Sequence, residues 1–348
     1  MAKALLRRCS EDVLATFYAA GLSPINVEKE WQKGDYVGGG AFGEVYEGTN
    51  RRTGQRVAIK VINSIAVGGL SYNTILTEMR VLKYDSEHEN ITKFYGAYRH
   101  KDAITEKQEI WLIMELCQGG SVGDIVKFLA KNGEHLDEPI IAYILQEVIK
   151  ALSYLHNRLV MHRDIKGQNI MLTADGGVRL IDFGISCKLD ASQNRRISSV
   201  GTSHWMPPEV IFCDKDPEGC DYDVRCDVWS LGITAIELAE GQPPHGELSS
   251  DEIRYHIPRN EPPSLRDPLH WSTTFKAFLA RCLKKWCDDR PFFDELLADP
   301  FIQTCPKNPS DAKSTLVKLS RRCRESKDKT ETILTPGGSR RRKPGKAY

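Results

Sequence analysis

The spacing of apolar residues divides the chain into a β-rich part and a longer helical part. Short apolar stretches within 36–62 are separated by turn signals, and residues 109–115 form another apolar run, so both regions are predicted as strands. Apolar residues recur at helical spacing within 71–84, which predicts one helix among these strands. Beyond residue 122, helical patterns dominate over 138–157, 224–241 and 272–285. The pattern predicts an α+β protein whose two parts meet near Gly119.

Both ends of the chain differ from its middle. Within an N-terminal extension, residues 1–30, a partial helix over 10–20 is predicted from the apolar residues Val13, Leu14, Phe17 and Tyr18. Residues 302–348 hold thirteen Lys/Arg against four Asp/Glu, a net charge of +9. We therefore expect a basic, disordered tail with one short helix over 311–324. The run 340–343 could be a nuclear-import or acidic-lipid patch, although a solvated disordered segment is favoured.

Composition and charge narrow the functional classes. The net charge of +1 argues against a globally basic nucleic-acid-binding protein. No run of about 18 apolar residues occurs and charges interrupt the first residues, so neither a membrane span nor a secretory signal is expected. The ten cysteines are scattered and lack CxxC or zinc-site spacing. They are predicted as reduced thiols of a cytosolic or nuclear protein, and we favour the cytoplasm.

A glycine-rich stretch near the start of the β-rich part fits the pattern GxGxxGxV. Glycines let the backbone approach phosphate groups closely, although the same pattern also suits an ordinary β-turn. Glu44 and Tyr46 continue as strand, which favours a hairpin over a nucleotide rather than a Rossmann turn. The predicted nucleotide contacts here are Val37, Gly38, Gly39, Gly40, Ala41, Phe42, Gly43 and Val45.

The next strand ends in Val57-Ala58-Ile59-Lys60. A lysine in an apolar strand needs anionic partners for its ammonium group. The functional interpretation places Lys60 on the phosphates of ATP, with Glu78 of the following helix as its partner and Ala58 beside the nucleotide. The alternative is a solvated lysine at the edge of a sheet.

Two motifs in the helical part decide the class of chemistry. His162 to Asn169 fits HRDxxxxN, and Asp182-Phe183-Gly184 follows thirteen residues later. Each motif alone could be a polar loop or a turn. In this order, after the glycine-rich stretch and Lys60, they match the protein-kinase signature set.

The signature set assigns four further roles in phosphoryl transfer. Asp164 would accept the proton of the substrate hydroxyl, and Lys166 would reach the γ-phosphate. Lysine at position 166 is typical of serine/threonine kinases. Asn169 and Asp182 would supply oxygen ligands to Mg²⁺. No catalytic group of the set is absent from the sequence.

The segment between the two parts resembles the hinge of protein kinases. Met114 resembles the gatekeeper residue, and a packed core methionine is compatible with that role. The backbone of Glu115 and Cys117 would pair with adenine, and Asp124 would lie near the ribose.

Residues 182–209 correspond to the activation segment of protein kinases. Phosphate on Ser198 or Ser199 would add nearly two negative charges and could pair with Arg163, which would order the loop. The alternative is an unmodified polar loop. The hydroxyl of Thr202 is expected to contact the catalytic Asp and Lys.

Two further contacts are expected from the same resemblance. Glu209 is expected to form a buried ion pair with Arg290, and Asp227 is expected to support the backbone of the catalytic loop.

Residues 31–301 resemble the germinal-centre-kinase branch of the sterile-20-like serine/threonine kinases. The Misshapen and Nck-interacting group, the MAP kinase kinase kinase kinases, is the nearest match, and the kinase domains of class III myosins are the nearest rival. The resemblance implies a two-lobed kinase fold, with a small antiparallel β-rich lobe over about 31–117 and a larger helical lobe over about 118–301. It rests on the strings HRDIKGQN (162–169), VWSLGITAIELAEG (228–241), IPRN (257–260) and DPFI (299–302).

The resemblance implies a serine/threonine protein kinase that uses ATP and Mg²⁺, phosphorylates protein substrates and acts upstream in a stress-type MAP kinase cascade. Three departures from the family pattern put its rate and specificity in question: Ser203-His204, Pro207 and Gly39, which makes three glycines in a row. The first two support an alternative, a kinase-fold scaffold with weak catalysis that acts through partner binding.

Overall fold

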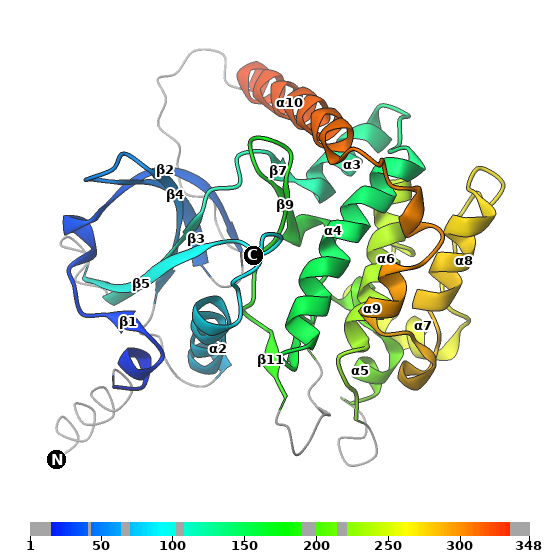
Figure 1. Cartoon of the computed structure of the whole chain (residues 1–348), viewed down its shortest axis with the longest axis horizontal. Helices are drawn as coiled ribbons and strands as arrows, with labels where there is room; N and C mark the ends of the chain where they lie inside the picture. The colour runs from blue at the N-terminus through cyan, green and yellow to red at the C-terminus, as the bar shows by residue number, and fades with distance from the viewer. Residues whose placement is uncertain are drawn as a thin grey trace.

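The computed structural model describes residues 15–40, 43–63, 70–101, 108–189, 200–213 and 221–334. A β-rich lobe and a helical lobe lie side by side, joined by the segment around Gly119 (Figure 1). The small lobe holds a six-stranded sheet in the order β1-β5-β6-β4-β3-β2, antiparallel except for β1 beside β5. Its strands are β1 (Leu22–Ser23), β2 (Trp31–Gly40), β3 (Gly43–Asn50), β4 (Arg56–Asn63), β5 (Phe94–Lys101) and β6 (Gln108–Glu115).

The alternation of side chains along β4 orients the predicted lysine. Val57, Ile59 and Val61 are buried in an apolar cluster on one face of the sheet, together with Trp31 and Trp111. Successive residues of a strand point to opposite faces, so Lys60 points to the other face. That face is covered by helix α2 (Leu70–Tyr84) (Figure 1). The strand register therefore directs the lysine toward the helix that carries Glu78.

The N-terminal segment packs against the small lobe. Of the helix predicted over 10–20, residues 15–19 are helical, residue 20 is in a turn, and residues 10–14 lie outside the described residues. Phe17 and Leu22 are 3% and 4% exposed and belong to the same apolar cluster as Ile75 and Met79 of α2. This segment is therefore part of the core of the small lobe rather than a solvated extension.

The large lobe is built around two long helices, as the periodicity predicts. Helices α4 (Glu138–His156) and α6 (Cys226–Glu240) are buried along most of their length, and α8 (Thr273–Cys282) is shorter than the expected 272–285. Around them lie α3 (Val122–Lys131), α5 (Pro208–Phe212), α7 (Ser250–Arg259) and α9 (Phe293–Leu297). Short strands frame the site: β7 (Gly120–Ser121), β8 (Val160–Met161), β9 (Ile170–Leu172), β10 (Val178–Leu180) and β11 (Cys187–Lys188). The predicted α+β, two-lobed kinase fold is confirmed.

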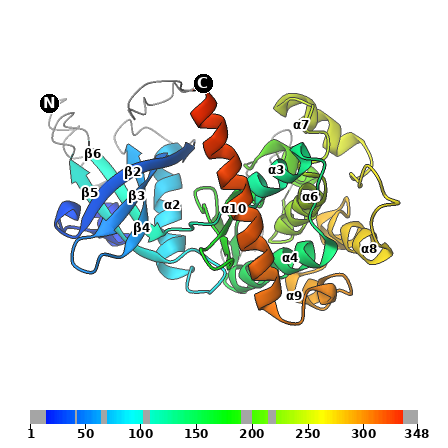
Figure 2. The same ribbon diagram turned by 90° about the horizontal axis from the view of Figure 1, so that it is seen from above.

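The segment after residue 302 differs from the prediction. Residues 309–334 form one continuous helix, α10 (Pro309–Leu334), instead of a disordered tail. Helix α10 packs against α3 and α4 of the large lobe, and Figure 2, which looks down on this face, shows α10 lying over the large lobe on the side next to the sheet. The helix is stabilised by a narrow buried stripe at helical spacing, which its basic composition conceals: Ala312, Leu316, Ser320 and Cys323. Residues 335–348, with the run 340–343, lie outside the described residues.

Two expectations drawn from composition concern cysteines and membranes. Each cysteine within the described ranges is a free thiol. Among the helices of these ranges, none combines the length and the apolar character that a membrane crossing requires.

Candidate active site

The predicted lysine lies in a buried cluster of charges between the two lobes. The Lys60 Nζ is 2.6 Å from the Glu78 Oε1 and 3.3 Å from the Asp182 Oδ1. Burial lowers the pKa of Lys60, but the two carboxylates outweigh this effect and raise it above its usual value. The ammonium group is therefore charged at neutral pH, and the expected contact with Glu78 is present.

Three polar side chains contact one carboxylate of the catalytic loop. The Asp164 Oδ2 accepts hydrogen bonds from the Lys166 Nζ at 2.7 Å and the Asn169 Nδ2 at 2.8 Å. The Thr202 Oγ1 donates to the Asp164 Oδ1 at 2.5 Å and accepts from the Lys166 Nζ at 2.7 Å. The contacts expected of Thr202 are therefore present, and Asp164 is held in one orientation.

The backbone of this loop is supported by a carboxylate of helix α6. Asp227 is fully buried, and its Oδ2 and Oδ1 accept from the backbone N–H groups of His162 at 2.8 Å and Arg163 at 2.7 Å. The His156 Nε2 lies 2.9 Å from the Asp227 Oδ2. The backbone of Arg163 has a φ of 68°, a conformation that residues other than glycine rarely adopt. The two accepted N–H bonds hold the loop in this conformation, and the expected support by Asp227 is confirmed.

Two side-chain oxygens of the predicted metal ligands have no hydrogen-bond donor within the described ranges. They are the Oδ1 of Asn169 and the Oδ2 of Asp182; the other polar atom of each side chain is already bonded. The described residues contain no group of three or more His, Cys, Asp or Glu that could hold a metal without help. Mg²⁺ in nucleotide sites is typically held by one or two protein oxygens together with phosphate oxygens. Asn169 and Asp182 fit that arrangement.

The glycine-rich stretch forms the tip of the β2–β3 hairpin. Gly38 pairs with Val45 and Gly40 pairs with Gly43. A Cβ at Gly38 would meet no heavy atom within 4 Å, whereas a Cβ at Gly43 would lie 2.5 Å from the Val61 carbonyl oxygen. At Gly39 a Cβ would lie 2.9 Å from the Tyr36 hydroxyl. The glycine-rich stretch therefore forms the predicted hairpin and not a Rossmann turn.

Two residues predicted at the tip of this hairpin, Ala41 and Phe42, lie outside the described residues. Val37, which precedes the glycines on β2, is 55% exposed.

The hinge residues follow β6 in the expected order. Met114 is partly buried and pairs across the sheet with Ala58 of β4. The side chain of Glu115 pairs with Arg179 at 2.9 Å, and burial raises the pKa of the Cys117 thiol to about 12. The Glu115 side chain therefore points to the large lobe, and the Cys117 thiol is protonated at neutral pH.

Asp124 lies near the start of α3, in its first turn. Its Oδ1 accepts from the Gln168 Nε2 at 3.2 Å, and its Oδ2 accepts from the Lys327 Nζ at 2.9 Å. Sequence reasoning missed both partners. Gln168 stands inside the HRDxxxxN motif and could have been considered, but Lys327 lies 203 residues away on α10 and no local signal indicates it.

The activation segment is described at both ends. Arg290 forms a bidentate pair with Glu209, at 2.6 Å and 2.7 Å, and its side chain is fully buried, so that expected ion pair is confirmed. Arg163 donates to the backbone carbonyls of Ile185 and Ser186. Ser198 and Ser199 lie outside the described residues.

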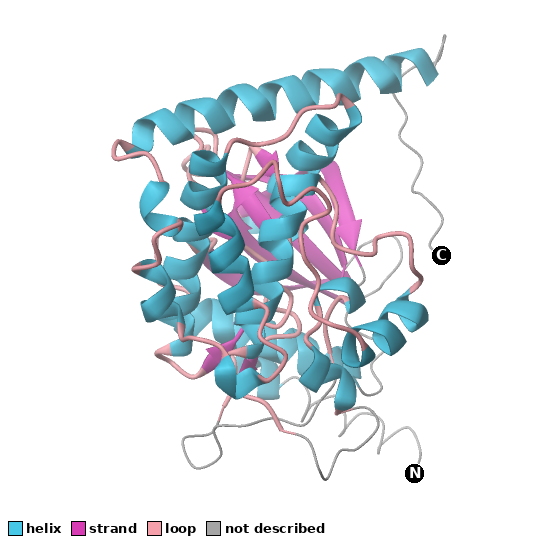
Figure 3. Cartoon of the chain, turned by 90° about the vertical axis from the view of Figure 1, so that its right-hand side faces the viewer, coloured by secondary structure: helices cyan, strands magenta, loops and turns pink. Residues whose placement is uncertain are grey.

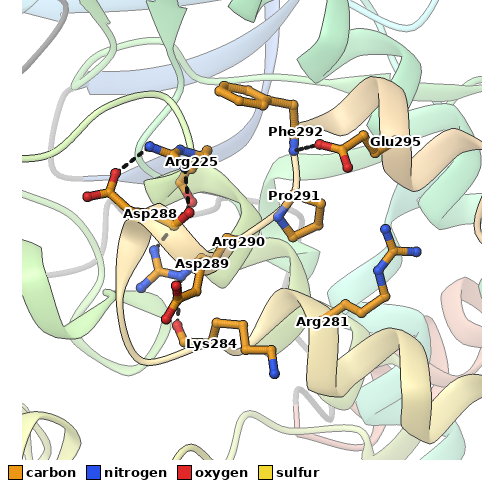
Figure 4. A pocket seen from close by; sticks show the side chains of 9 residues that line it. All are labelled: Arg225, Arg281, Lys284, Asp288, Asp289, Arg290, Pro291, Phe292 and Glu295. Atoms are coloured by element: carbon orange, nitrogen blue, oxygen red, sulfur yellow. Dashed lines mark hydrogen bonds and ion pairs between the residues drawn. The ribbon is translucent and has the colours of Figure 1, made fainter.

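A separate hollow lies on the surface of the large lobe (Figure 4). Its cations include Arg225, which is bonded to Asp223 and Asp288, and Arg281, which is bonded to Asp299. None of the residues predicted for the nucleotide site lines this hollow. This hollow is therefore separate from the predicted nucleotide site.

Comparison with known proteins agrees with this geometry. The protein kinase domain family matches residues 31–302. Myosin-IIIa of Homo sapiens is 46% identical over 272 residues, which make up 78% of this chain and 16% of that protein. Misshapen-like kinase 1 of Rattus norvegicus is 44% identical over 272 residues, again 78% of this chain and 20% of that protein.

Serine/threonine-protein kinase mig-15 of Caenorhabditis elegans is 40% identical over 296 residues, which cover 84% of this chain and 26% of that protein. The chain thus spans at most about a quarter of these three relatives. Both groups that the sequence resembles, the Misshapen-related kinases and the class III myosins, are among its relatives. This chain belongs to the protein kinase family.

Proposed function

We propose that this chain is a serine/threonine protein kinase that transfers the γ-phosphate of ATP to hydroxyl groups of protein substrates. The observation that supports this most directly is the cluster around Asp164, where a lysine, an amide and a threonine hydroxyl all contact one carboxylate. The buried Lys60 ammonium group and the free oxygens of Asn169 and Asp182 lie in the same region between the lobes. The assignment as a kinase depends on the match between these residues and the protein-kinase signature set.

The nucleotide would bind between the glycine-rich hairpin and the large lobe. The open space at Gly38 lets backbone N–H groups approach phosphates, and Lys60, oriented by Glu78, supplies a fixed positive charge. Asn169 and Asp182 would hold Mg²⁺, which neutralises charge on the phosphates when it is bound. Ala58, Met114 and the backbone at 115–117 are proposed to surround the adenine.

The residues of this chain are proposed to contribute to the reaction in two ways: they position the reacting groups, and they supply a carboxylate that accepts a proton. Asp164 would take the proton of the attacking hydroxyl, a step that typically contributes about 10²–10⁴-fold to the rate. Lys166 and Asn169 hold its carboxylate at hydrogen-bond distance, so little reorganisation is required. Thr202 contacts both Asp164 and Lys166 and would line the place where a serine or threonine hydroxyl enters.

The context of this activity is also part of the proposal. The kinase domain is taken as residues 31–301, in a cytoplasmic protein that binds no nucleic acid. Phosphorylation of Ser198 or Ser199 is proposed to order the activation segment through Arg163, whose guanidinium already contacts that segment. A place upstream in a MAP kinase cascade is proposed from the resemblance of residues 31–301 to the Misshapen and Nck-interacting group.

The test is transfer of radiolabelled phosphate from Mg-ATP to the protein itself and to a basic substrate, followed by mapping of the phosphorylated sites. The variant Asp164→Asn preserves the shape of the side chain but not its basicity, and we expect it to lower the rate at least about 100-fold. The exposed Asp267→Asn in the same lobe is the matched control and is expected to behave as wild type. Label on Ser198 or Ser199 would support the regulatory assignment.

Two outcomes would count against the proposal. Equal transfer by wild type and Asp164→Asn would remove Asp164 from the mechanism. If ATP binds but no transfer occurs, even with Ser198→Glu and Ser199→Glu, the kinase-fold scaffold becomes the better description.

A further inference from the structure

Helix α10 lies along the hinge between the two lobes. The Ser320 Oγ, which is 2% exposed, donates to the carbonyl oxygen of Gly119 at 2.6 Å. One turn later the Arg324 Nη1 donates to the carbonyl oxygen of Gln118 at 3.0 Å. Figure 3 shows the helix lying across one edge of the helical lobe. The helix therefore bonds directly to the backbone on which the predicted adenine contacts are built.

The N-terminal end of α10 also lies close to the large lobe. At Gly176, in the turn between β9 and β10, a Cβ would lie 2.5 Å from the backbone carbonyl oxygen of Lys313. In the middle of the helix, Arg322 forms a bidentate pair with Glu134, at 3.1 Å and 2.7 Å. The helix is thus held at several points along its length, and its last described contacts reach the rim of the nucleotide site.

The contact nearest the nucleotide site joins Lys327 to Asp124. The Lys327 Nζ is 2.9 Å from the Asp124 Oδ2, and the two side chains are 58% and 38% exposed. The Oδ1 of the same carboxylate accepts from Gln168. Burial raises the pKa of Asp124, but the hydrogen bonds from Lys327 and Gln168 outweigh it and lower the pKa. Both oxygens of an ionised carboxylate are therefore engaged.

We propose that Lys327 is a positioning residue of the nucleotide site, whose ammonium group competes with the ribose hydroxyls for the Asp124 carboxylate. This inference rests on the proposed function, in which the nucleotide binds between the lobes, and on the expectation from the sequence that Asp124 lies near the ribose. A carboxylate oxygen can accept two hydrogen bonds, so a ribose hydroxyl that donates to the Oδ2 of Asp124 would share this oxygen with the Lys327 ammonium group and weaken that bond. Docking of α10 therefore weakens nucleotide binding, and nucleotide binding weakens docking of the last turns of α10 by the same factor.

The size of the effect follows from the exposure of the pair. Exposed ion pairs are weak and are screened by salt. We expect removal of the ammonium group to tighten nucleotide binding by about two- to fivefold at low salt, and the gain to vanish at about 1 M salt, where the Debye length is about 3 Å.

The experiment measures the Kd of Mg-ADP by titration calorimetry on the whole chain. Lys327→Met removes the charge and keeps a side chain that favours helix, and Lys327→Arg keeps the charge. Lys318→Met is the matched control, because Lys318 is exposed on the same helix and has no ion-pair partner within the described ranges. We expect tighter binding for Lys327→Met, and wild-type Kd values for Lys327→Arg and Lys318→Met.

Two further readouts separate positioning from a structural effect of the helix. With 2′,3′-dideoxy-ADP, which lacks both ribose hydroxyls, wild type and Lys327→Met should have equal Kd values. In wild type, Mg-ADP should accelerate amide hydrogen exchange in residues 320–330. A gain in affinity that persists with the dideoxy nucleotide would show that Lys327 does not act through the ribose.

The outcomes distinguish this inference from the proposed function. If all four proteins bind Mg-ADP with the same Kd, or if Lys327→Met binds more weakly than wild type, the positioning role is wrong and the proposed function stands. If none of them, wild type included, binds Mg-ADP, both the proposed function and this inference are overturned.

Discussion

The catalytic loop and the glycine-rich hairpin face the same proposed site but are held in opposite ways. The backbone of the catalytic loop is bonded to Asp227, a fully buried carboxylate that accepts two N–H groups and contacts a histidine. The hairpin is held by backbone pairing between β2, at the edge of the sheet, and β3. Val37 beside it is 55% exposed.

The difference has a physical consequence for motion. Displacing Asp227 would leave several buried donors unpaired, at a cost of about 1–3 kcal/mol for each. A hairpin at the edge of a sheet with few buried contacts opens at much lower cost. The fold thus holds the proposed proton acceptor still while the loop proposed to cover the phosphates can adapt.

The variant Asp227→Asn would weaken the support of the catalytic loop, and it has the largest expected effect on stability. The asparagine amide nitrogen would face a buried backbone N–H group instead of accepting from it. We expect the free energy of unfolding to fall by about 2–4 kcal/mol, measured by urea denaturation with tryptophan fluorescence. Asp35→Asn on the exposed surface of β2 is the control and should change stability by less than about 0.5 kcal/mol. Equal stability of Asp227→Asn and wild type would mean that the loop does not depend on this carboxylate.

Two glycines of the glycine-rich hairpin, Gly43 and Gly38, differ in the room that they leave for a side chain. Gly43 has a φ of 145° and no room for a Cβ beside the Val61 carbonyl, so Gly43→Ala should destabilise the protein by about 1–3 kcal/mol. Gly38 has open space at the same hairpin, and Gly38→Ala should leave stability within about 0.5 kcal/mol. Nucleotide affinity should still fall in Gly38→Ala, because the added methyl group points into the space proposed for phosphates. Similar unfolding curves for the two variants would contradict this account.

The dependence of stability on pH at acidic values gives a smaller test of how Asp227 holds the catalytic loop. Burial raises the pKa of Asp227, but the hydrogen bonds that its carboxylate accepts from the His156 side chain and the His162 backbone, together with electrostatic attraction to these residues, outweigh it and lower the pKa below its ordinary value. A carboxyl whose pKa is lowered by folding stabilises the protein above its unfolded pKa of about 3.9 and loses that contribution as the pH falls through the folded value. Each unit of lowering corresponds to about 1.4 kcal/mol.

The measurement compares wild type and Asp227→Asn in urea at several pH values. The difference in stability should shrink as the pH falls below about 4, where the carboxyl group of Asp227 becomes protonated. A difference that does not change with pH would show that the charge of Asp227 is not what stabilises the loop.

Much of the fold was predictable because its signals are local. The alternation in Val57-Ala58-Ile59-Lys60 sets which face of the sheet the lysine occupies, and helical spacing over 138–157 and 224–241 predicts α4 and α6. The motif residues Asp164 and Asn169 meet because they are five positions apart in one loop. The contact between Asp227 and the same loop was expected from family resemblance and not from spacing.

The amino-acid sequence by itself determined the order of strands and helices, the lysine face of β4 and the identity of the charged groups, since these depend on near neighbours along the chain. Only the tertiary structure decided that α10 docks on the hinge and that Lys327 meets Asp124 across 203 residues. A basic composition is typical of disorder, and four small or apolar residues on one helical stripe are too weak a signal to outweigh it. That stripe becomes a stable helix because the large lobe offers a complementary surface, which exists only once the remote elements have packed.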